Sequence, residues 1–246
     1  SRTVEGPIHR YTYGDAAKRS RQLANALEKL GLKEGDTVGT LAWNTFRHFE
    51  LYFGVSGIGC VVNTVNPRLF PEQLTYIINH AENQYLFIDL SFVELVESLE
   101  SELKDVKGYV ILTDKENMPE TKLNNAMCYE DLISEESDEF SWPEFDENTA
   151  SSLCYTSGTT GNPKGVLYSH RSTILHAWIV SSGNVAKVSS STCILPVVPM
   201  FHVNAWGIPY AGAMFGAKLV FPGPALDGAS VYELIDNEKP DLLMGV

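Results

Sequence analysis

The residues best suited to do chemistry lie in one short segment, which runs from Tyr155 to Gly165 and reads YTSGTTGNPKG. It combines three glycines, four hydroxyl side chains and one lysine. Glycine lets backbone N–H groups turn toward an anion with no Cβ in the way. Hydroxyl groups add donors and can also ligate a hard cation such as magnesium. The segment therefore predicts a loop that holds a polyphosphate, with Lys164 as its mobile positive charge.

Two familiar phosphate loops do not fit this segment. The Walker pattern needs Gly-Lys followed by Ser or Thr, but Pro163 precedes Lys164 here and Gly165 follows it. The dinucleotide pattern G-x-G-x-x-G is absent as well. Pro163 and the flanking apolar residues indicate a loop between two strands, not one that opens a helix. The alternative is a Gly-rich surface hairpin without function.

The whole segment resembles the phosphate-loop signature of the adenylate-forming superfamily, which includes acyl-CoA synthetases, peptide-synthetase adenylation domains and luciferases. Other blocks extend the resemblance along the chain and are similar to the fatty acyl-CoA ligase branch. They are residues 41–44 (LAWN), 66–74 (NPRLFPEQL), 199–206 (PMFHVNAW), 216–218 (GAK) and 222–224 (PGP).

The resemblance implies roles for individual residues. The residues implied to hold the phosphates of ATP and the departing pyrophosphate are Thr156, Ser157, Gly158, Thr159, Thr160, Gly161 and Lys164. Thr156 matches the position implicated in magnesium binding. His202 and Trp206 would line the acyl site; they are four residues apart, so a helical turn would put them on one face. Considered without the resemblance, a lone histidine and tryptophan more often pack than act. No catalytic residue is expected within the chain, because the family's catalytic lysine belongs to a C-terminal domain.

The implied function is that of an ATP-dependent acid–CoA ligase using ATP, Mg²⁺ and coenzyme A. The blocks are most similar to ligases that act on 3-methylmercaptopropionate, and a medium- or long-chain fatty acid is the alternative substrate. A non-catalytic nucleotide-binding relic is a further alternative. A peptide-synthetase module is disfavoured by the block that contains His202 and Trp206. The resemblance also leaves a homodimer open. The chain by itself is expected to be inactive, as a fragment cut at both ends.

Apolar periodicity alternates between helix and strand along the chain. Helices are expected at 15–30, 46–57, 71–82, 92–103, 172–185, 205–215 and 230–239, and strands at 37–43, 60–62, 85–89, 109–113, 152–156, 165–168, 192–198 and 218–221. Such alternation predicts an α/β fold with a largely parallel sheet. We expect two Rossmann-like sheet subdomains: residues 1–148, with an acidic connector, and residues 149–246, with the phosphate loop.

Composition narrows the class of protein. With 246 residues, 44% of them hydrophobic and 20% charged, the chain has globular composition and is neither disordered nor a coiled coil. Its net charge of -13 disfavours nucleic acid as a partner. Residues 94–147 hold 17 acidic and 4 basic residues, and we expect a solvated surface with a polar connector near 114–148.

Several remaining features predict no special chemistry. The four cysteines are scattered without a C-x-x-C pair, which excludes a disulfide scaffold and predicts a cytoplasmic protein. No apolar run approaches the roughly 20 residues of a membrane helix. His170 and His176 lack the H-E-x-x-H spacing of a metal site. Arg47, His48 and Arg68 are expected to be solvated surface charges.

Overall fold

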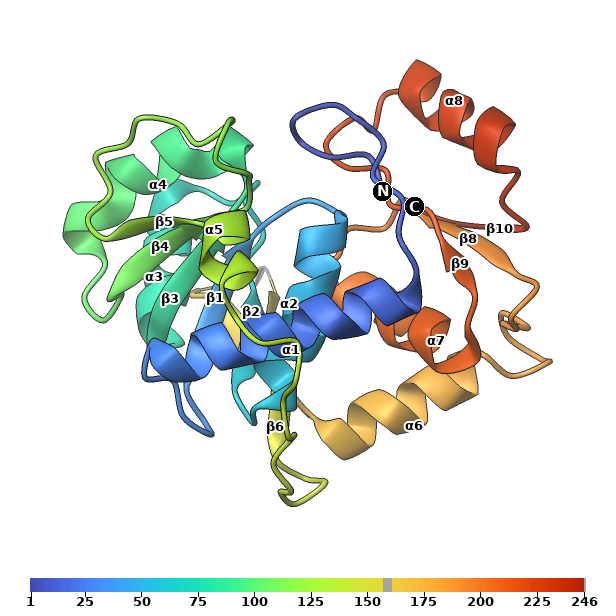
Figure 1. The fold of residues 1–246 in the computed structure, drawn as a ribbon, viewed down its shortest axis with the longest axis horizontal. Coiled ribbons are helices and arrows are strands. Elements are labelled where there is room, and N and C mark those ends of the chain that lie inside the picture. The colour runs from blue at the N-terminus through green and yellow to red at the C-terminus, as the bar shows by residue number, and fades with distance from the viewer. Residues whose placement is uncertain (157–160, 246) are drawn as a thin grey trace.

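The computed structural model describes residues 1–156 and 161–245 (Figure 1). Its main sheet has seven strands in the order β5-β4-β3-β1-β2-β6-β7. These strands are β1 (Thr37–Leu41), β2 (Val61–Thr64), β3 (Asn83–Ile88), β4 (Gly108–Ile111), β5 (Ala126–Cys128), β6 (Ala150–Thr156) and β7 (Lys164–Ser169). All neighbours pair in parallel except β6 and β7, which are antiparallel. The predicted α/β class with a largely parallel sheet is confirmed.

Helices cover both faces of the seven-stranded sheet. On one face, α1 (Tyr13–Lys29), α2 (Phe46–Gly57) and α5 (Tyr129–Ser134) bury their apolar residues in one cluster. On the other face, α3 (Pro71–His80) and α4 (Val93–Leu99) form a second cluster. Along β3, Phe87 belongs to the first cluster, whereas Leu86 and Ile88 belong to the second. This alternation with a period of two residues is what a strand buried on both faces requires.

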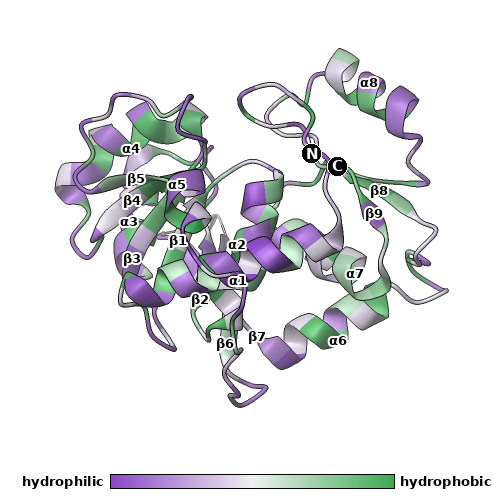
Figure 2. Ribbon diagram, in the orientation of Figure 1, coloured by the Kyte–Doolittle hydropathy of each residue, from purple (hydrophilic) through white to green (hydrophobic). Residues whose placement is uncertain are grey.

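A second, parallel sheet has the order β10-β8-β9 and lies beyond α7 in Figure 1. Its strands are β8 (Cys193–Pro196), β9 (Lys218–Leu219) and β10 (Leu242–Met244). The helices in this part of the chain are α6 (His170–Val180), α7 (Ile208–Phe215) and α8 (Gly228–Glu238), of which α6 contacts β6 and β7 of the main sheet. Figure 2 shows α1 and α8 with alternating hydrophilic and hydrophobic colours, as expected for amphipathic surface helices. No helix among the described residues is long and apolar enough to cross a membrane.

Helix starts follow local chemistry. α1 begins after Thr12, whose hydroxyl accepts from the Asp15 N–H while the Asp15 carboxylate accepts from the Thr12 N–H. This reciprocal pair is a capping box, which satisfies two N–H groups that the helix leaves without partners. α2 begins after Thr45 and spans Phe46–Gly57, the range expected from its apolar pattern.

The acidic segment differs from the expected connector. Residues 114–148 contain β5 and α5, neither of which was expected, and α5 buries Tyr129 and Ile133 completely or nearly so. The polar connector near 114–148 is therefore only partly solvated, because it packs into the core at Tyr129 and Ile133. The division into subdomains 1–148 and 149–246 stays a prediction, although the seven-stranded sheet takes strands from both sides of it.

Candidate nucleotide and carboxylate site

The expected phosphate loop connects β6 and β7, so the prediction of a loop between two strands is confirmed. The pairing of these strands ends at Thr156 opposite Lys164. The Thr156 hydroxyl donates to the Lys164 carbonyl oxygen across 3.4 Å, and both residues are exposed. Gly161 has φ +95°, a value that favours glycine. Ser157, Gly158, Thr159 and Thr160 lie outside the described residues, and all the proposed loop roles stay predictions.

Lys164 begins the edge strand of the sheet with its side chain exposed. It forms no ion pair within residues 1–156 and 161–245. The ammonium group is thus available to an anion bound over the hairpin, which is the role the sequence predicts for it.

His202 and Trp206 flank a left-handed turn. Residues 203–206 have φ between 47° and 55°, and Gly207 continues the turn with φ 74°. The expected helix from residue 205 is wrong at its start, since α7 begins only at Ile208. His202 and Trp206 therefore do not share the face of a right-handed helix. Left-handed backbone costs roughly 1–2 kcal/mol per non-glycine residue, so the surrounding contacts must stabilise this turn.

The turn holds its two predicted site residues differently. The His202 side chain is exposed, whereas Trp206 is half-buried against the cluster formed by α2, α6 and α7. Nε2 of His176 donates to the Trp206 carbonyl oxygen across 3.0 Å, because a carbonyl can only accept. Trp206 thus also packs as a core aromatic would, and its role at an acyl site stays a prediction.

A residue between them, Asn204, links this turn to the strand that leads into the phosphate loop. Its Nδ2 donates to the Ser152 hydroxyl on β6 across 2.9 Å. Its Oδ1 accepts from the Cys154 thiol, also on β6, across 3.1 Å. Burial raises the pKa of Cys154, which keeps the thiol protonated and able to donate. The turn between His202 and Trp206 is therefore bonded to β6, the same strand that leads into the predicted phosphate loop. Asn204 was not expected as a site residue, because a lone asparagine between Val203 and Ala205 carries no periodic signal.

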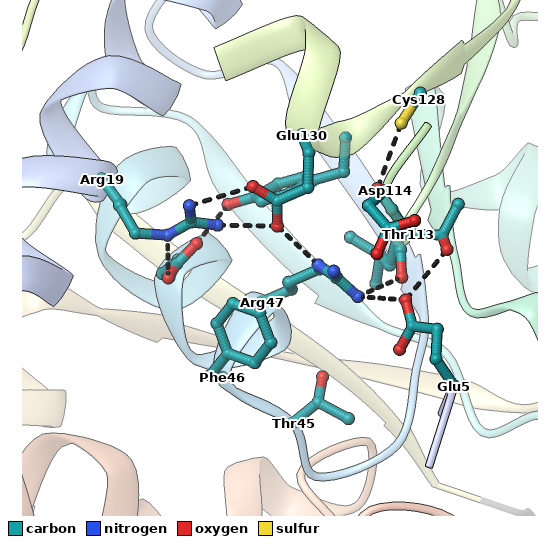
Figure 3. A network of polar contacts seen from close by, with 12 residues as sticks. Glu5, Arg19, Thr45, Phe46, Arg47, Thr113, Asp114, Cys128 and Glu130 are labelled. Atoms are coloured by element: carbon teal, nitrogen blue, oxygen red, sulfur yellow. Dashed lines mark hydrogen bonds and ion pairs between the residues drawn. The ribbon is translucent and has the colours of Figure 1, made fainter. Parts of the chain in front are cut away.

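Two basic residues expected at the surface are buried. Arg47 lies in an ion network shown in Figure 3, where it donates to Glu5, Glu130 and the Leu112 carbonyl oxygen at 2.7, 2.8 and 3.0 Å. His48 is fully buried. The expectation of solvated charge is wrong for both, because α2 is covered by the N-terminal segment, α1 and α5. Arg68 is exposed, as expected, and stacks over Trp43 and Phe201.

Comparisons with known proteins agree with this arrangement. A family model described as "AMP-binding enzyme" matches residues 2–246. A medium-chain-fatty-acid–CoA ligase from Ectopseudomonas oleovorans is 50% identical over 243 residues, which cover 99% of this chain and 44% of that protein. A 3-methylmercaptopropionyl-CoA ligase from Ruegeria lacuscaerulensis is also 50% identical over 243 residues, with 99% of this chain and 45% of that protein covered.

A solved structure of an anthranilate CoA ligase in complex with anthranoyl-AMP has the same fold, with a TM-score of 0.86 at 25% identity. It matches 96% of this chain and 45% of its own. The chain spans less than half the length of the two curated relatives named above. With a family model that covers nearly every residue, the chain belongs to the AMP-binding enzyme family.

Proposed function

We propose that the protein containing this chain is an ATP-dependent acid–CoA ligase. The observation that carries the proposal is the β6–β7 hairpin, which contains the segment YTSGTTGNPKG. The strand pairing ends at Thr156 and Lys164, so the residues between these two form the loop. The chain that carries this hairpin belongs to the AMP-binding enzyme family. The Gly- and hydroxyl-rich loop supplies N–H and O–H donors for phosphate oxygens. Lys164 adds positive charge, and no residue in 1–156 or 161–245 forms an ion pair with it.

The proposed reaction has two steps. An oxygen of the substrate carboxylate attacks the α-phosphorus of ATP, so the acyl–phosphate bond forms as the bond to the β-phosphate breaks and pyrophosphate leaves. The sulfur of CoA then attacks the acyl carbon, the thioester forms, and AMP leaves with the oxygen it gained. In the first step the loop and Lys164 would bind pyrophosphate as its charge develops, which is electrostatic stabilisation by preorganised donors.

Thr156 is the described residue that fits a magnesium ion. Its hydroxyl is exposed, and the hydroxyl oxygen keeps lone pairs free while its hydrogen goes to the Lys164 carbonyl oxygen. Hydroxyl and phosphate oxygens are ligands that Mg²⁺ accepts. When bound, the ion would neutralise charge on the phosphates of ATP.

The proposed acid is 3-methylmercaptopropionate, and a medium- or long-chain fatty acid is the second candidate. The second candidate is supported by the comparisons, since a ligase named for a medium-chain fatty acid and one named for 3-methylmercaptopropionate are each 50% identical to this chain. In this proposal Trp206 would limit an acyl pocket, and His202 would face the carboxylate. The four free, buried cysteines fit a reducing compartment, for which we propose the cytoplasm.

The test is pyrophosphate release by the full-length protein with ATP, Mg²⁺ and a panel of carboxylic acids, with and without CoA. We expect release that depends on the acid, and thioester only when CoA is present. Competing 3-methylmercaptopropionate against octanoate separates the two substrate candidates. Lys164→Ala should slow release, while Lys115→Ala, a change at another exposed lysine, should not. Absence of release with every acid, although ATP binds, would support the non-catalytic relic instead.

A further inference from the structure

The side chain of Asn204 is a buried centre of hydrogen bonds within a strained turn. The residue is 7% exposed and has φ 49° and ψ 41°. Besides its bonds to Ser152 and Cys154, its Oδ1 lies 3.4 Å from the hydroxyl oxygens of Thr64 and of Tyr52. Asparagine is among the few non-glycine residues that adopt left-handed backbone readily. One residue thus combines a tolerated backbone conformation with a buried amide that has hydrogen-bond partners at both Nδ2 and Oδ1.

The four partners come from three elements that do not include the turn. Tyr52 lies on α2, Thr64 on β2, and Ser152 and Cys154 on β6. Nδ2 of Asn204 points to the Ser152 hydroxyl and Oδ1 to the Cys154 thiol, so both ends of the amide bond to β6. Tyr52 also donates to the Met200 carbonyl oxygen across 2.6 Å. Hydrogen bonds therefore hold the turn at two places: at Met200, just before it, by Tyr52 of α2, and at Asn204, within it, by residues of β6.

Of these elements, β6 is the strand that leads into the phosphate loop. Ser152 and Cys154 precede Thr156 on the same strand, and the pairing of β6 with β7 fixes where Thr156 and Lys164 lie. His202 and Trp206 are two residues to either side of Asn204. A shift of the turn relative to β6 would thus displace the predicted acyl side of the site from its phosphate side.

We propose that Asn204 is a positioning residue that sets the carboxylate side of the site relative to the phosphate loop. The inference rests on the proposed function, since it assigns His202 and Trp206 to the acid and the β6–β7 hairpin to ATP. In-line attack of a carboxylate on the α-phosphorus needs both reactants held in one geometry. The bonds of Asn204 to Ser152 and Cys154 directly link the two segments that hold them. Asn204 touches no substrate itself and acts through the turn.

The test compares Asn204→Gly, Asn204→Ala and Ser152→Ala in the full-length protein. Glycine keeps left-handed backbone accessible and removes only the side chain, whereas alanine adds backbone strain. Ser152→Ala removes the acceptor of Nδ2 and leaves the turn sequence intact. Asn184→Gly, at an exposed asparagine outside the site, is the matched control. The measurements are KM for the acid, KM for MgATP, kcat, thermal unfolding, and protease cleavage between residues 202 and 207.

We expect Asn204→Gly to raise KM for the acid about tenfold or more, which corresponds to about 1.4 kcal/mol. KM for MgATP should stay within about twofold of wild type, because the hairpin itself is unchanged. Ser152→Ala should show the same division between the two substrates to a smaller extent. Cleavage within 202–207 should accelerate in Asn204→Gly and Asn204→Ala but not in Asn184→Gly.

Two results would overturn the proposal. In one, Asn204→Gly behaves as wild type in both KM values, so that only backbone conformation matters at this position. In the other, kcat and the unfolding temperature both fall and the KM values for acid and MgATP change equally, which indicates a purely structural residue. If wild-type protein releases no pyrophosphate with any acid, the proposed function fails. The protease pattern then decides separately whether Asn204 holds the turn.

Discussion

His48 and Asp89 bind the two main-chain polar groups of Trp43. Nδ1 of His48 donates to the Trp43 carbonyl oxygen across 3.0 Å, and the Trp43 N–H donates to Oδ2 of Asp89 across 2.6 Å. Both side chains are buried. The Trp43 ring in turn lies against Phe201, directly before His202, with ring centroids 6.0 Å apart. Two titratable groups therefore support the residue on which the candidate acyl segment rests.

His48 should make the protein less stable in acid. Burial lowers its pKa from 6.5 to about 4, although the bond to Trp43 acts in the opposite direction. The neutral ring is fully satisfied, since Nε2 accepts from the Thr40 hydroxyl across 3.0 Å. The unfolded protein thus binds a proton that the folded protein does not. The contribution of His48 to the free energy of unfolding is complete above about pH 6.5. It should fall between about pH 6.5 and 4, with a limiting slope of about 1.4 kcal/mol per pH unit.

The measurement is urea unfolding of wild type and His48→Gln between pH 4.5 and 7.5. Glutamine can donate and accept but does not titrate, so the variant should lack this part of the slope. Identical slopes in the two proteins would show that His48 is not the group responsible.

Asp89 should have the opposite effect. Burial raises its pKa from 3.8 to about 7, against the lowering effects of the Trp43 N–H and Arg47, and with a small further rise from Glu5. Between about pH 4 and 7 the folded protein keeps a proton that the unfolded protein loses, so this group destabilises the fold as pH rises. Asp89→Asn retains an oxygen acceptor for the Trp43 N–H without the charge. Its stability relative to wild type should grow with pH, by on the order of a few kcal/mol at pH 8.

Comparing the free energies of unfolding of Asp89→Asn and wild type at pH 4, 6 and 8 checks this. A difference that stays constant with pH would mean that Asp89 ionises as an exposed aspartate does. The double variant with His48→Gln serves as a control, because the two residues share Trp43 and their effects need not add.

The sequence predicted those features that depend on neighbours along the chain. The bounds of α2 followed from its apolar spacing, and the hairpin around Pro163 from the strands on either side of it. Features set by distant partners were missed. Glu130 reads as one more acid in an acidic segment, yet its partners Arg19 and Arg47 are 111 and 83 residues away. Likewise, residues 205 and 206 were expected to start a helix, because the sequence does not reveal the partners of Asn204, which lie 50 to 152 residues away.

Breaking the buried ion network should be costly. Glu130 accepts two bonds from Arg19 and one from Arg47 (Figure 3). Burial opposes its ionisation, but the hydrogen bonds and charges of the two arginines outweigh burial and lower its pKa. Glu130→Gln removes one counter-charge from each arginine, but Arg19 keeps Glu50 and Arg47 keeps Glu5. Because Glu130 and Arg19 are only partly buried, the free energy of unfolding should fall by about 1–3 kcal/mol, between the values for exposed and for buried pairs.

The matched control is Glu147→Gln, which breaks an exposed pair with Arg171. Such pairs contribute about 0–1 kcal/mol. Chemical denaturation of both variants at neutral pH decides the matter. Equal, small effects would show that the network in Figure 3 contributes no more than surface charge.

Thr156 provides the sharpest test of the magnesium proposal, because two substitutions separate its hydroxyl from its shape. Thr156→Ser keeps the hydroxyl, and Thr156→Val keeps the branched volume and the strand preference at the end of β6. If the hydroxyl oxygen ligates Mg²⁺ on ATP, the valine variant should need more Mg²⁺ for half-maximal pyrophosphate release and run on the order of 10–100-fold slower. The serine variant should stay near wild type on both measures. A titration of Mg²⁺ at saturating ATP measures both quantities. Should the valine variant titrate with Mg²⁺ as wild type does, Thr156 is no metal ligand, and its part in the hairpin is limited to the bond with the Lys164 carbonyl oxygen.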